Sequence, residues 1–320
     1  MADRETVPPG GSLPSVSVIV PIYNVARTLP TTLPAWIGQD YPAEWLLVDD
    51  GSTDGTRALL EVEVAGQPSV RLLRHEENRG RAAARNTGIE AATGDVLLFL
   101  DADMRPEPDF VRQHAMLHRD TAVAGAVSHA VLEGLDPSDP YHRYLESRRG
   151  AKAVGPERPL PFKYFIIGYT SVKAHVVREV GGFDERLSYG EDLDFAYRIA
   201  QRYPDGLRYS NRPVVHHYDH GSLDDRIAKL CEFGQGNLPL LLAKHPGLAR
   251  AANVDFVDSP DLPSTVRRRL QRAVLQPSVA SAVRSLLRYV PESVSDVLVR
   301  YVLAVTIAEA YRSALAPEPH

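Results

Sequence analysis

Four short apolar runs, separated by segments of helical pattern, constrain the fold of this chain more than any other feature. The apolar runs span 16–20, 45–48, 70–73 and 96–100, and the helical segments span 28–37, 56–64 and 81–92. Strands that alternate with helices form βαβ units around a parallel sheet. We therefore predict an α/β fold with a mainly parallel central sheet, which binds its ligands beyond the carboxyl ends of the strands.

The pattern loosens after residue 100 and changes again after Ser222. We predict a helix at 141–149, a strand at 166–172, an amphipathic helix at 191–202, and short strands at 207–209 and 213–217. From residue 222 on, helical periodicity dominates and is interrupted near Pro239, Pro260, Pro263, Pro277 and Pro291. The predicted organisation is a disordered leader over 1–15, an α/β domain over 16–221 and a helical region over 222–320.

Composition argues against several classes of protein. A formal net charge of −5 gives no electrostatic reason to expect a nucleic-acid partner. The single cysteine, Cys231, can form neither an intrachain disulfide nor a thiolate metal cluster, and we expect it half-buried on a helix. No run reaches the roughly 18 apolar residues of a membrane span, so we expect a cytoplasmic protein, at most peripheral to the inner face of the membrane.

Asp101-Ala102-Asp103 follows the apolar run at 96–100 directly. Two carboxylates one residue apart at a strand end can share a hard divalent cation, Mn²⁺ or Mg²⁺, that bridges a diphosphate. A solvated turn is the alternative, because Asp is common in turns. The position at the end of a buried strand favours the metal site.

Two further motifs follow apolar runs. The segment 49–56 begins Asp49-Asp50-Gly51-Ser52, and its side chains can hold a base or sugar hydroxyls, or simply form a turn and cap a helix. The segment 78–86 places arginines near a helix start, where guanidinium groups and the helix dipole both suit a phosphate. An exposed basic face is the alternative for these arginines.

Acidic residues and histidines stand near the end of the α/β domain. Gly190-Glu191-Asp192-Leu193-Asp194 opens the helix predicted at 191–202. Its carboxylates complement the helix dipole, or one of them serves as a general base that deprotonates an acceptor hydroxyl. Three histidines follow the last short strand, and each could supply a further metal ligand: His216, His217 and His220.

Taken in order, these motifs resemble the inverting family 2 glycosyltransferases, which have the Rossmann-like GT-A fold. The resemblance covers about 16–222, roughly two thirds of the chain. It includes the turn Pro21-Ile22-Tyr23-Asn24 after the first strand, the segments 49–56 and 78–88, and the Asp101/Asp103 pair. It also includes 181–185 (Gly-Gly-Phe-Asp-Glu) followed by Glu191-Asp192, which is similar to the acceptor-side signature of that family.

The resemblance implies metal-dependent, inverting transfer of a sugar from a UDP-, GDP- or dTDP-sugar to a hydroxyl of a glycan, a lipid-linked or a small-molecule acceptor. It implies Asp192, assisted by Glu191, as the base, and Asp101, Asp103 and His216 as metal ligands. The implied nucleotide-sugar contacts are Pro21, Tyr23, Asp50, Gly80, Arg85 and Asp101, with Asp50 on the nucleobase. A Gln-x-x-Arg-Trp motif is absent, which favours addition of single sugars over processive synthesis.

Rival interpretations differ in what they require. A dinucleotide-dependent dehydrogenase needs a Gly-x-Gly-x-x-Gly turn where Pro21 to Asn24 stand, and a nucleotidyltransferase needs a Gly-rich loop there. A catalytically inactive homologue could bind nucleotide-sugars as a binding or scaffold protein, but the presence of Asp101, Asp103 and Asp192 together argues against it. An enzyme is therefore the favoured hypothesis.

The helical region carries arginines interleaved with apolar residues. They are Arg267, Arg268, Arg269, Arg284, Arg288 and Arg300. Such helices could contact an anionic membrane peripherally or form a homodimer interface. An ordinary helical cap with a solvated basic face is the third interpretation.

Overall fold

The structure of the 320-residue chain is a computed structural model, and it describes residues 12–148, 150–218, 220–251 and 276–315. Most of the predicted leader therefore lies outside the described residues, as do Pro260, Pro263 and the arginines at 267–269.

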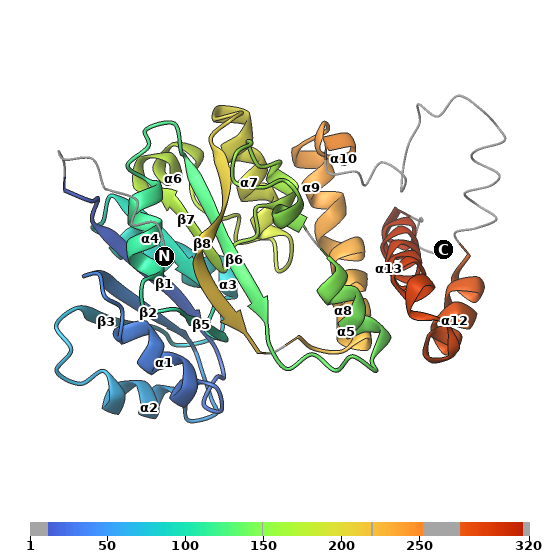
Figure 1. The fold of residues 1–320 in the computed structure, drawn as a ribbon, viewed down its shortest axis with the longest axis horizontal. Coiled ribbons are helices and arrows are strands. Elements are labelled where there is room, and N and C mark those ends of the chain that lie inside the picture. The colour runs from blue at the N-terminus through green and yellow to red at the C-terminus, as the bar shows by residue number, and fades with distance from the viewer. Residues whose placement is uncertain (1–11, 149, 219, 252–275, 316–320) are drawn as a thin grey trace, which may run out of the picture.

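An eight-stranded sheet in the order β3-β2-β1-β4-β7-β6-β8-β5 forms the centre of the described chain (Figure 1). Its strands are β1 (Val16–Ile22), β2 (Glu44–Asp50), β3 (Val70–His75), β4 (Val96–Leu100), β5 (Met104–Pro106), β6 (Gly125–Leu132), β7 (Tyr169–Lys173) and β8 (Leu207–His217). The first four strands pair in parallel, and so do β6 and β8. Antiparallel pairing of β7 with β4 and β6, and of β5 with β8, makes the sheet mixed. The prediction of a mainly parallel α/β sheet is confirmed.

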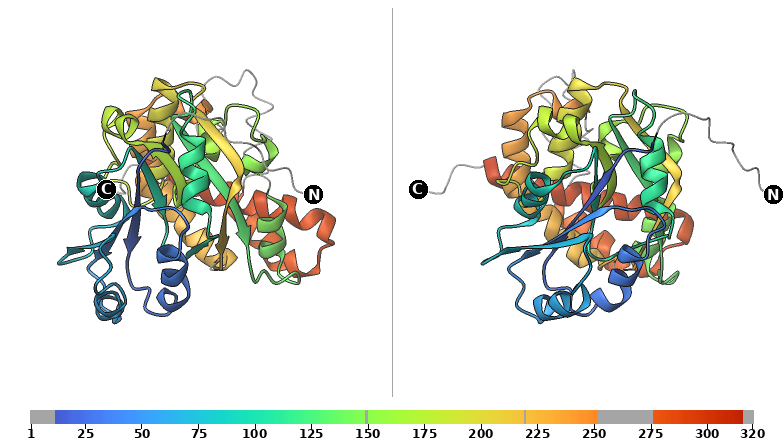
Figure 2. Two further views of the ribbon diagram at one scale, coloured as in Figure 1. Left: turned by 60° about the vertical axis from the view of Figure 1, so that its left-hand side comes forward. Right: turned by 90° about the vertical axis from the view of Figure 1, so that its left-hand side faces the viewer.

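Helices cover both faces of this sheet (Figures 1 and 2). In the α/β part they are α1 (Leu29–Ile37), α2 (Thr56–Glu63), α3 (Arg81–Ala91), α4 (Phe110–Leu117), α5 (Pro140–Ser147), α6 (Ala174–Val180) and α7 (Glu191–Arg202). Side chains alternate along β1, so Val18 and Val20 join the core under α1 and α4, while Ile19 joins the core under α3, α6 and α7. A Cβ at Gly88 would lie 2.4 Å from Ile19 Cγ2, so glycine lets α3 approach the sheet.

Two predicted short strands are one strand. β8 runs continuously from Leu207 to His217, through the polar stretch 210–213 that indicated a break. Its pairing with β6 shifts register between Val127 and His129, and this irregularity accommodates Pro213, which cannot donate to a ladder. The prediction of a break between two strands was therefore wrong. The polar residues after Tyr209 belong to an irregularity within one strand, although their sequence is typical of a turn.

The C-terminal helices pack on the α/β part. They are α8 (Leu223–Glu232), α9 (Leu238–Lys244), α10 (Leu248–Ala251), α12 (Pro277–Leu286) and α13 (Glu292–Leu315). Short turns complete the chain: η1 (Gly150–Ala153), η2 (Phe162–Tyr164), η3 (Phe233–Asn237) and η4 (Leu287–Tyr289). Val299 and Leu303 of α13 join one core with Tyr141 of α5 and Leu230 of α8. Helices therefore follow the sheet as predicted, and α9, α12 and α13 begin at or beside prolines.

Other predictions for this region meet the structure as follows. Cys231 is half-buried on α8, as expected. Arg284 pairs with Asp224, and the Arg300 guanidinium lies over the ring of Tyr144, so both contact their own chain. Among the helices that the structure describes, none combines the length and apolar character needed to cross a membrane.

Candidate active site

The functional side chains gather at the carboxyl edge of the sheet, where β2 and β4 end. A pocket of about 870 Å³ opens beside this edge, and Arg81, Asp101, Asp103 and His217 contribute to its lining. Residues of β6, α5, η1, η2 and α8 also line the pocket. Segments far apart in sequence thus enclose one space next to the paired carboxylates.

Asp101 is fixed by two contacts as the chain leaves β4. Its backbone N–H donates to the carbonyl of Gly168 at 2.8 Å, and its carboxylate accepts from Arg85 Nη2 at 2.8 Å. Gly168 has φ +129°, and a Cβ there would lie 2.4 Å from Asp101 Oδ2. A glycine is therefore required at 168 for Asp101 to occupy its place.

Arg85 lies inside the protein, although the sequence placed it on the nucleotide. The side chain is 1% exposed, and Nη1 donates to Glu191 Oε1 at 2.9 Å while Nη2 binds Asp101. A buried guanidinium needs such carboxylates to offset its lost hydration. Arg85 thus ties α3, β4 and α7 together from behind the pocket. Arg81, one turn earlier and half-exposed, lines the pocket and lies 3.2 Å from Glu191 Oε1.

The structure brings His217, rather than His216, to Asp103. The β5–β8 pairing sets His217 opposite Met104, and His217 Nε2 lies 3.1 Å from Asp103 Oδ2. His216 points to the other face, where Nε2 lies 2.6 Å from Glu107 and Nδ1 2.8 Å from Glu133. Successive side chains of a strand face opposite ways, so only one of the two can reach Asp103.

These residues suit a hard divalent cation. Asp103 Oδ1 is buried with no hydrogen-bond partner, and Oδ2 faces an imidazole that can coordinate metal. No group of three or more metal-binding side chains is preassembled among the residues that the structure describes. Mg²⁺-type sites in nucleotide enzymes commonly use one or two protein carboxylates and complete the shell with substrate phosphates and water. Asp103 with His217 fits that pattern.

The Asp50 carboxylate is hydrogen-bonded to other groups of the protein. It is 3% exposed, and its two oxygens accept from the backbone N–H groups of Arg79 and Gly80 at 2.9 and 2.8 Å. His75 Nδ1 lies 2.6 Å from the same carboxylate. These contacts shape the turn that starts α3, and Gly80 contributes to the turn through its backbone. A contact between Asp50 and a nucleobase stays a prediction.

The turns after β1 and β2 form a continuous rim beside Asp50. Asn24, the residue with φ +52°, accepts from Thr53 N–H at 2.8 Å, and its own N–H donates to Ser52 at 3.0 Å. Pro21 belongs to β1, and the Tyr23 side chain is 47% exposed beyond it. The two turns are therefore joined, and Tyr23 offers an open aromatic face beside them.

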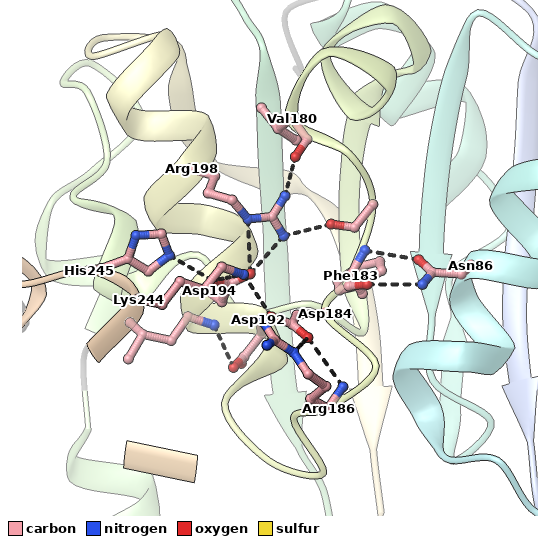
Figure 3. A network of polar contacts seen from close by, with 12 residues as sticks. Asn86, Val180, Phe183, Asp184, Arg186, Asp192, Asp194, Arg198, Lys244 and His245 are labelled. Carbon is pink, nitrogen blue, oxygen red and sulfur yellow. Dashed lines mark hydrogen bonds and ion pairs between the residues drawn. The ribbon is translucent and has the colours of Figure 1, made fainter. Parts of the chain in front are cut away.

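The three carboxylates that open α7 have separate environments. Glu191 is 2% exposed, with Oε1 on Arg85 and Oε2 buried without a partner. Asp194 is fully buried and binds Arg198, Lys244 and His245, so it anchors α9 to α7 (Figure 3). Asp192 accepts a hydrogen bond from the backbone N–H of Leu193 at 2.8 Å and remains partly accessible. Among these three carboxylates, only Asp192 is partly exposed and lacks an ion pair with a basic side chain.

The surroundings of Asp192 make it a stronger base than an ordinary carboxylate. Desolvation by the surrounding protein, followed by repulsion from Glu191, raises the pKa of Asp192 from 3.8 to about 6. The guanidinium groups of Arg85 and Arg81 act in the opposite direction and hold the value down. A carboxyl with a pKa near the working pH can accept a proton efficiently and still be mostly ionised.

The segment before α7 is anchored to α3. The Asn86 side chain accepts from Phe183 N–H at 2.9 Å and donates to the Phe183 carbonyl at 2.9 Å (Figure 3). The Phe183 ring packs edge-on against Phe99 and beside Phe195. Residues 181–185 thus hold α3 and α7 at a fixed separation, which positions Asp192.

Sequence reasoning did not identify several residues that the structure places in the pocket. They are the lining residues Tyr169, Tyr189 and Tyr209. Arg81 also lines the pocket, and sequence reasoning had included it only as one of the arginines of the segment 78–86. The tyrosines carry no local motif, and Tyr169 and Tyr209 belong to strands whose pairing is set by distant segments. A signal did exist for Arg81, which lies one helical turn before Arg85 and so shares its face.

The fold and the site together are those of a GT-A glycosyltransferase, and the comparisons with known proteins agree. The model of glycosyl transferase family 2 matches residues 17–181, and the chain belongs to this family. It is 30% identical over 244 residues to the pre-mycofactocin glycosyltransferase of Mycobacterium tuberculosis, covering 75% of this chain and 50% of that protein. It is 31% identical over 201 residues to glycosyltransferase AglE of Haloferax volcanii, covering 58% and 62%. The chain thus spans about half to two thirds of these relatives.

Solved structures share the fold. The mannosyltransferase PcManGT of Pyrobaculum calidifontis, in complex with GDP-Man and Mn²⁺, superposes with a TM-score of 0.61 at 23% identity, covering 98% of this chain and 91% of that chain. TarS residues 1–349 of S. aureus superpose with a TM-score of 0.54 at 18% identity, covering 94% and 90%. These similarities show a shared fold, and the aligned regions cover most of this chain.

Proposed function

We propose that this chain transfers one sugar at a time from a nucleotide-diphosphate sugar to an acceptor hydroxyl, with inversion and with help from Mn²⁺ or Mg²⁺. The observation that carries the proposal is the pairing of Asp103 with His217, where a buried carboxylate oxygen has no partner. The solved complexes of similar fold with GDP-Man and Mn²⁺, and with UDP and UDP-GlcNAc, support a nucleotide-sugar as donor.

Different residues bind the nucleoside, hold the cation and position the other side chains. The nucleoside lies against the ends of β1 and β2, at Pro21 and Asp50, and against Tyr23 in the turn that follows β1. Asp103 and His217 would hold the cation. When bound, the cation would neutralise the charge on the departing diphosphate. Arg85 keeps Asp101 and Glu191 in place, and its own burial prevents it from moving with the ligand.

Asp192 acts as the base. It accepts the proton of the acceptor hydroxyl while the oxygen attacks the anomeric carbon on the side opposite the leaving diphosphate. A single displacement inverts the anomeric centre and needs one base, and the site offers one partly accessible carboxylate at the start of α7. Glu191 contributes through charge, because its repulsion helps raise the pKa of Asp192.

Nucleotide binding tests the proposal. Thermal unfolding is followed with UDP, GDP and dTDP, each with and without Mn²⁺. A ligand at a hundred times its Kd stabilises the native state by about 2.7 kcal/mol. We expect one nucleotide to raise Tm in the presence of Mn²⁺, and Asp103→Ala to remove the metal-dependent part. A flat response to all three nucleotides would refute the proposal, while metal-dependent binding without turnover of any donor would indicate an inactive, nucleotide-binding homologue.

A matched pair of variants separates the two adjacent histidines. His217→Ala removes the imidazole that faces Asp103, whereas His216→Ala removes one held between Glu107 and Glu133. We expect the affinity for Mn²⁺ in the nucleotide complex to fall at least about tenfold in the first variant and to stay near wild type in the second. The reverse order would assign the metal to His216, as the sequence resemblance implied.

A further inference from the structure

Besides Arg81, the pocket lining includes a group of basic side chains, called the cationic wall from here on. Five basic side chains form this wall: Arg148, Lys152, Lys163, Arg226 and Lys229. They come from the end of α5, from η1, from η2 and from α8, so four segments contribute basic groups to the lining of one pocket. The carboxylates that the same segments contribute to the lining are Glu146 and Asp225, and Asp225 is bound to Ser222 in the cap of α8. Positive charge is therefore in excess there.

The cationic wall is not neutralised by the protein. Arg81, on the donor side of the pocket, pairs with Glu191. In contrast, no ion pair joins a carboxylate to any of the five basic groups of the wall within the described residues, although the charge of Lys229 acts on Asp225. Clustered cations repel one another, and a chain with a net charge of −5 has acidic residues available to pair with them. An anionic ligand would supply the missing counter-charge.

Tyrosine rings hold three of these cations in place. The Arg226 guanidinium lies 5.7 Å from the Tyr189 ring centroid and also donates a hydrogen bond to the Tyr189 hydroxyl. Arg148 lies 5.8 Å from the centroid of Tyr144 in the same way. Lys163 lies 5.5 Å from the ring centroid of its neighbour Tyr164. A cation–π contact orients a basic group and leaves its charge available to a further ligand.

The wall is continuous with the reaction centre. Tyr189, which contacts Arg226, lies two residues before Glu191, the first residue of α7. Tyr169 also lines the pocket, and its hydroxyl lies within the electrostatic influence of Arg148 as well as of Asp101 and Asp192. A molecule bound on the wall therefore shares the pocket with Asp101 and Asp103, and Tyr189 connects the lining to the start of α7, which carries Asp192.

We infer that the cationic wall binds a phosphate ester of the acceptor, so that the acceptor substrate is a phosphorylated molecule. Guanidinium and ammonium groups are the side chains that bind phosphate best, and several of them spread over four segments suit a group of more than one charge. Concentrating positive charge at one pocket of an acidic protein also steers such an anion to the site. This inference rests on the proposed transferase function, since it assigns the acceptor of that reaction.

Binding of simple phosphate esters tests the inference. Geranyl phosphate and glycerol 1-phosphate are titrated calorimetrically, with geraniol and glycerol as neutral counterparts, both without nucleotide and with Mn²⁺ and the nucleotide at saturation. The variants are Lys152→Gln/Lys163→Gln on the wall and Arg178→Gln as control. Arg178 is an exposed arginine of α6 outside the pocket lining. Thermal unfolding of each variant verifies that it is folded.

We expect the phosphate esters to bind with nucleotide present and the alcohols not to bind. The double variant should weaken that binding at least about tenfold, whereas Arg178→Gln should bind like wild type. Binding of both esters assigns recognition to the phosphate of a soluble molecule, and binding of geranyl phosphate alone assigns it to a lipid-linked phosphate.

Three results would overturn the inference. They are no binding of either ester, equal binding by wild type and the double variant, and binding that nucleotide abolishes. In the last case the cations serve the donor diphosphate, and the double variant should then lose affinity for nucleotide. Failure of nucleotide binding would instead overturn the proposed function, and the titrations without nucleotide would still decide whether the wall binds phosphate.

Discussion

The pH dependence of turnover tests the assignment of Asp192. Desolvation and the charge of Glu191 raise the pKa of this carboxyl from 3.8 to about 6. That difference corresponds to at most about 3 kcal/mol in favour of the protonated form. A carboxyl whose pKa is raised by folding adds stability below its unfolded pKa, and this contribution is lost as the pH rises through about 6. At neutral pH the protein therefore holds an ionised base in an unfavourable place.

The activity follows the ionised fraction. Since only the carboxylate can accept the proton, kcat/KM should fall about tenfold for each pH unit below the pKa of the base. A base with an ordinary pKa of 3.8 would keep nearly its full rate at one pH unit below 6. The assay is the initial rate of nucleoside diphosphate release from the donor, measured across pH at constant ionic strength, with circular dichroism to verify that the protein stays folded.

Two variants sharpen the measurement. Asp192→Asn should lower the rate by about 10² to 10⁴ and stabilise the fold at neutral pH by at most about 3 kcal/mol, because a neutral amide has no ionisation to disfavour. Glu191→Gln keeps a hydrogen-bonding group on Arg85 but removes the repelling charge, so the acid limb should move to lower pH. A rate that stays flat far below pH 6, or an Asp192→Asn variant less stable than wild type at neutral pH, would refute the assignment.

Three further predictions concern positions that support the site. Gly168→Ala should reduce both Tm and donor turnover, because its Cβ would lie 2.4 Å from Asp101 Oδ2 at a φ of +129°. Burial lowers the pKa of His118 to about 3, so this group should make the free energy of unfolding fall by about 1.4 kcal/mol for each pH unit below 6.5, as urea titrations at stepped pH would show. Asp194→Ala removes the buried carboxylate that pairs with Arg198, Lys244 and His245, and should cost about 3–5 kcal/mol in urea unfolding.

Each of these predictions has a control. Unchanged turnover in Gly168→Ala would show that Asp101 tolerates displacement. For His118, the comparison is His118→Gln, whose unfolding free energy should lose about one proton of pH dependence between pH 6.5 and 4; parallel curves would contradict the expectation. The control for Asp194→Ala is Asp224→Ala, which breaks an exposed pair with Arg284 and should cost less than about 1 kcal/mol.

Much of the framework was predictable from local pattern. The runs ending at Val48, Leu73 and Leu100 are strands of the expected type, and the helix at 191–202 has the predicted bounds. β6 was missed because Ser128 and His129 interrupt its apolar pattern. Ser128 is buried and bonded to His114 of α4 at 2.7 Å, a partner that no local pattern indicates. Secondary structure was thus predictable where burial alone decides residue type, and not where a distant polar partner does.

Some features of the candidate site are likewise set by consecutive residues, and others by contacts between distant segments. The sequence by itself determined that Asp101 and Asp103 follow a buried strand and that acidic residues open α7, because both are properties of consecutive residues. Only the tertiary structure decided that His217 faces Asp103, since this depends on the register of β5 with β8 across more than a hundred residues. It also decided that Arg85 turns inward and that Asp194 is bound by Lys244 and His245, leaving Asp192 accessible. Side chains of one type in one motif take different roles because burial and partners are set by segments that the motif does not contain.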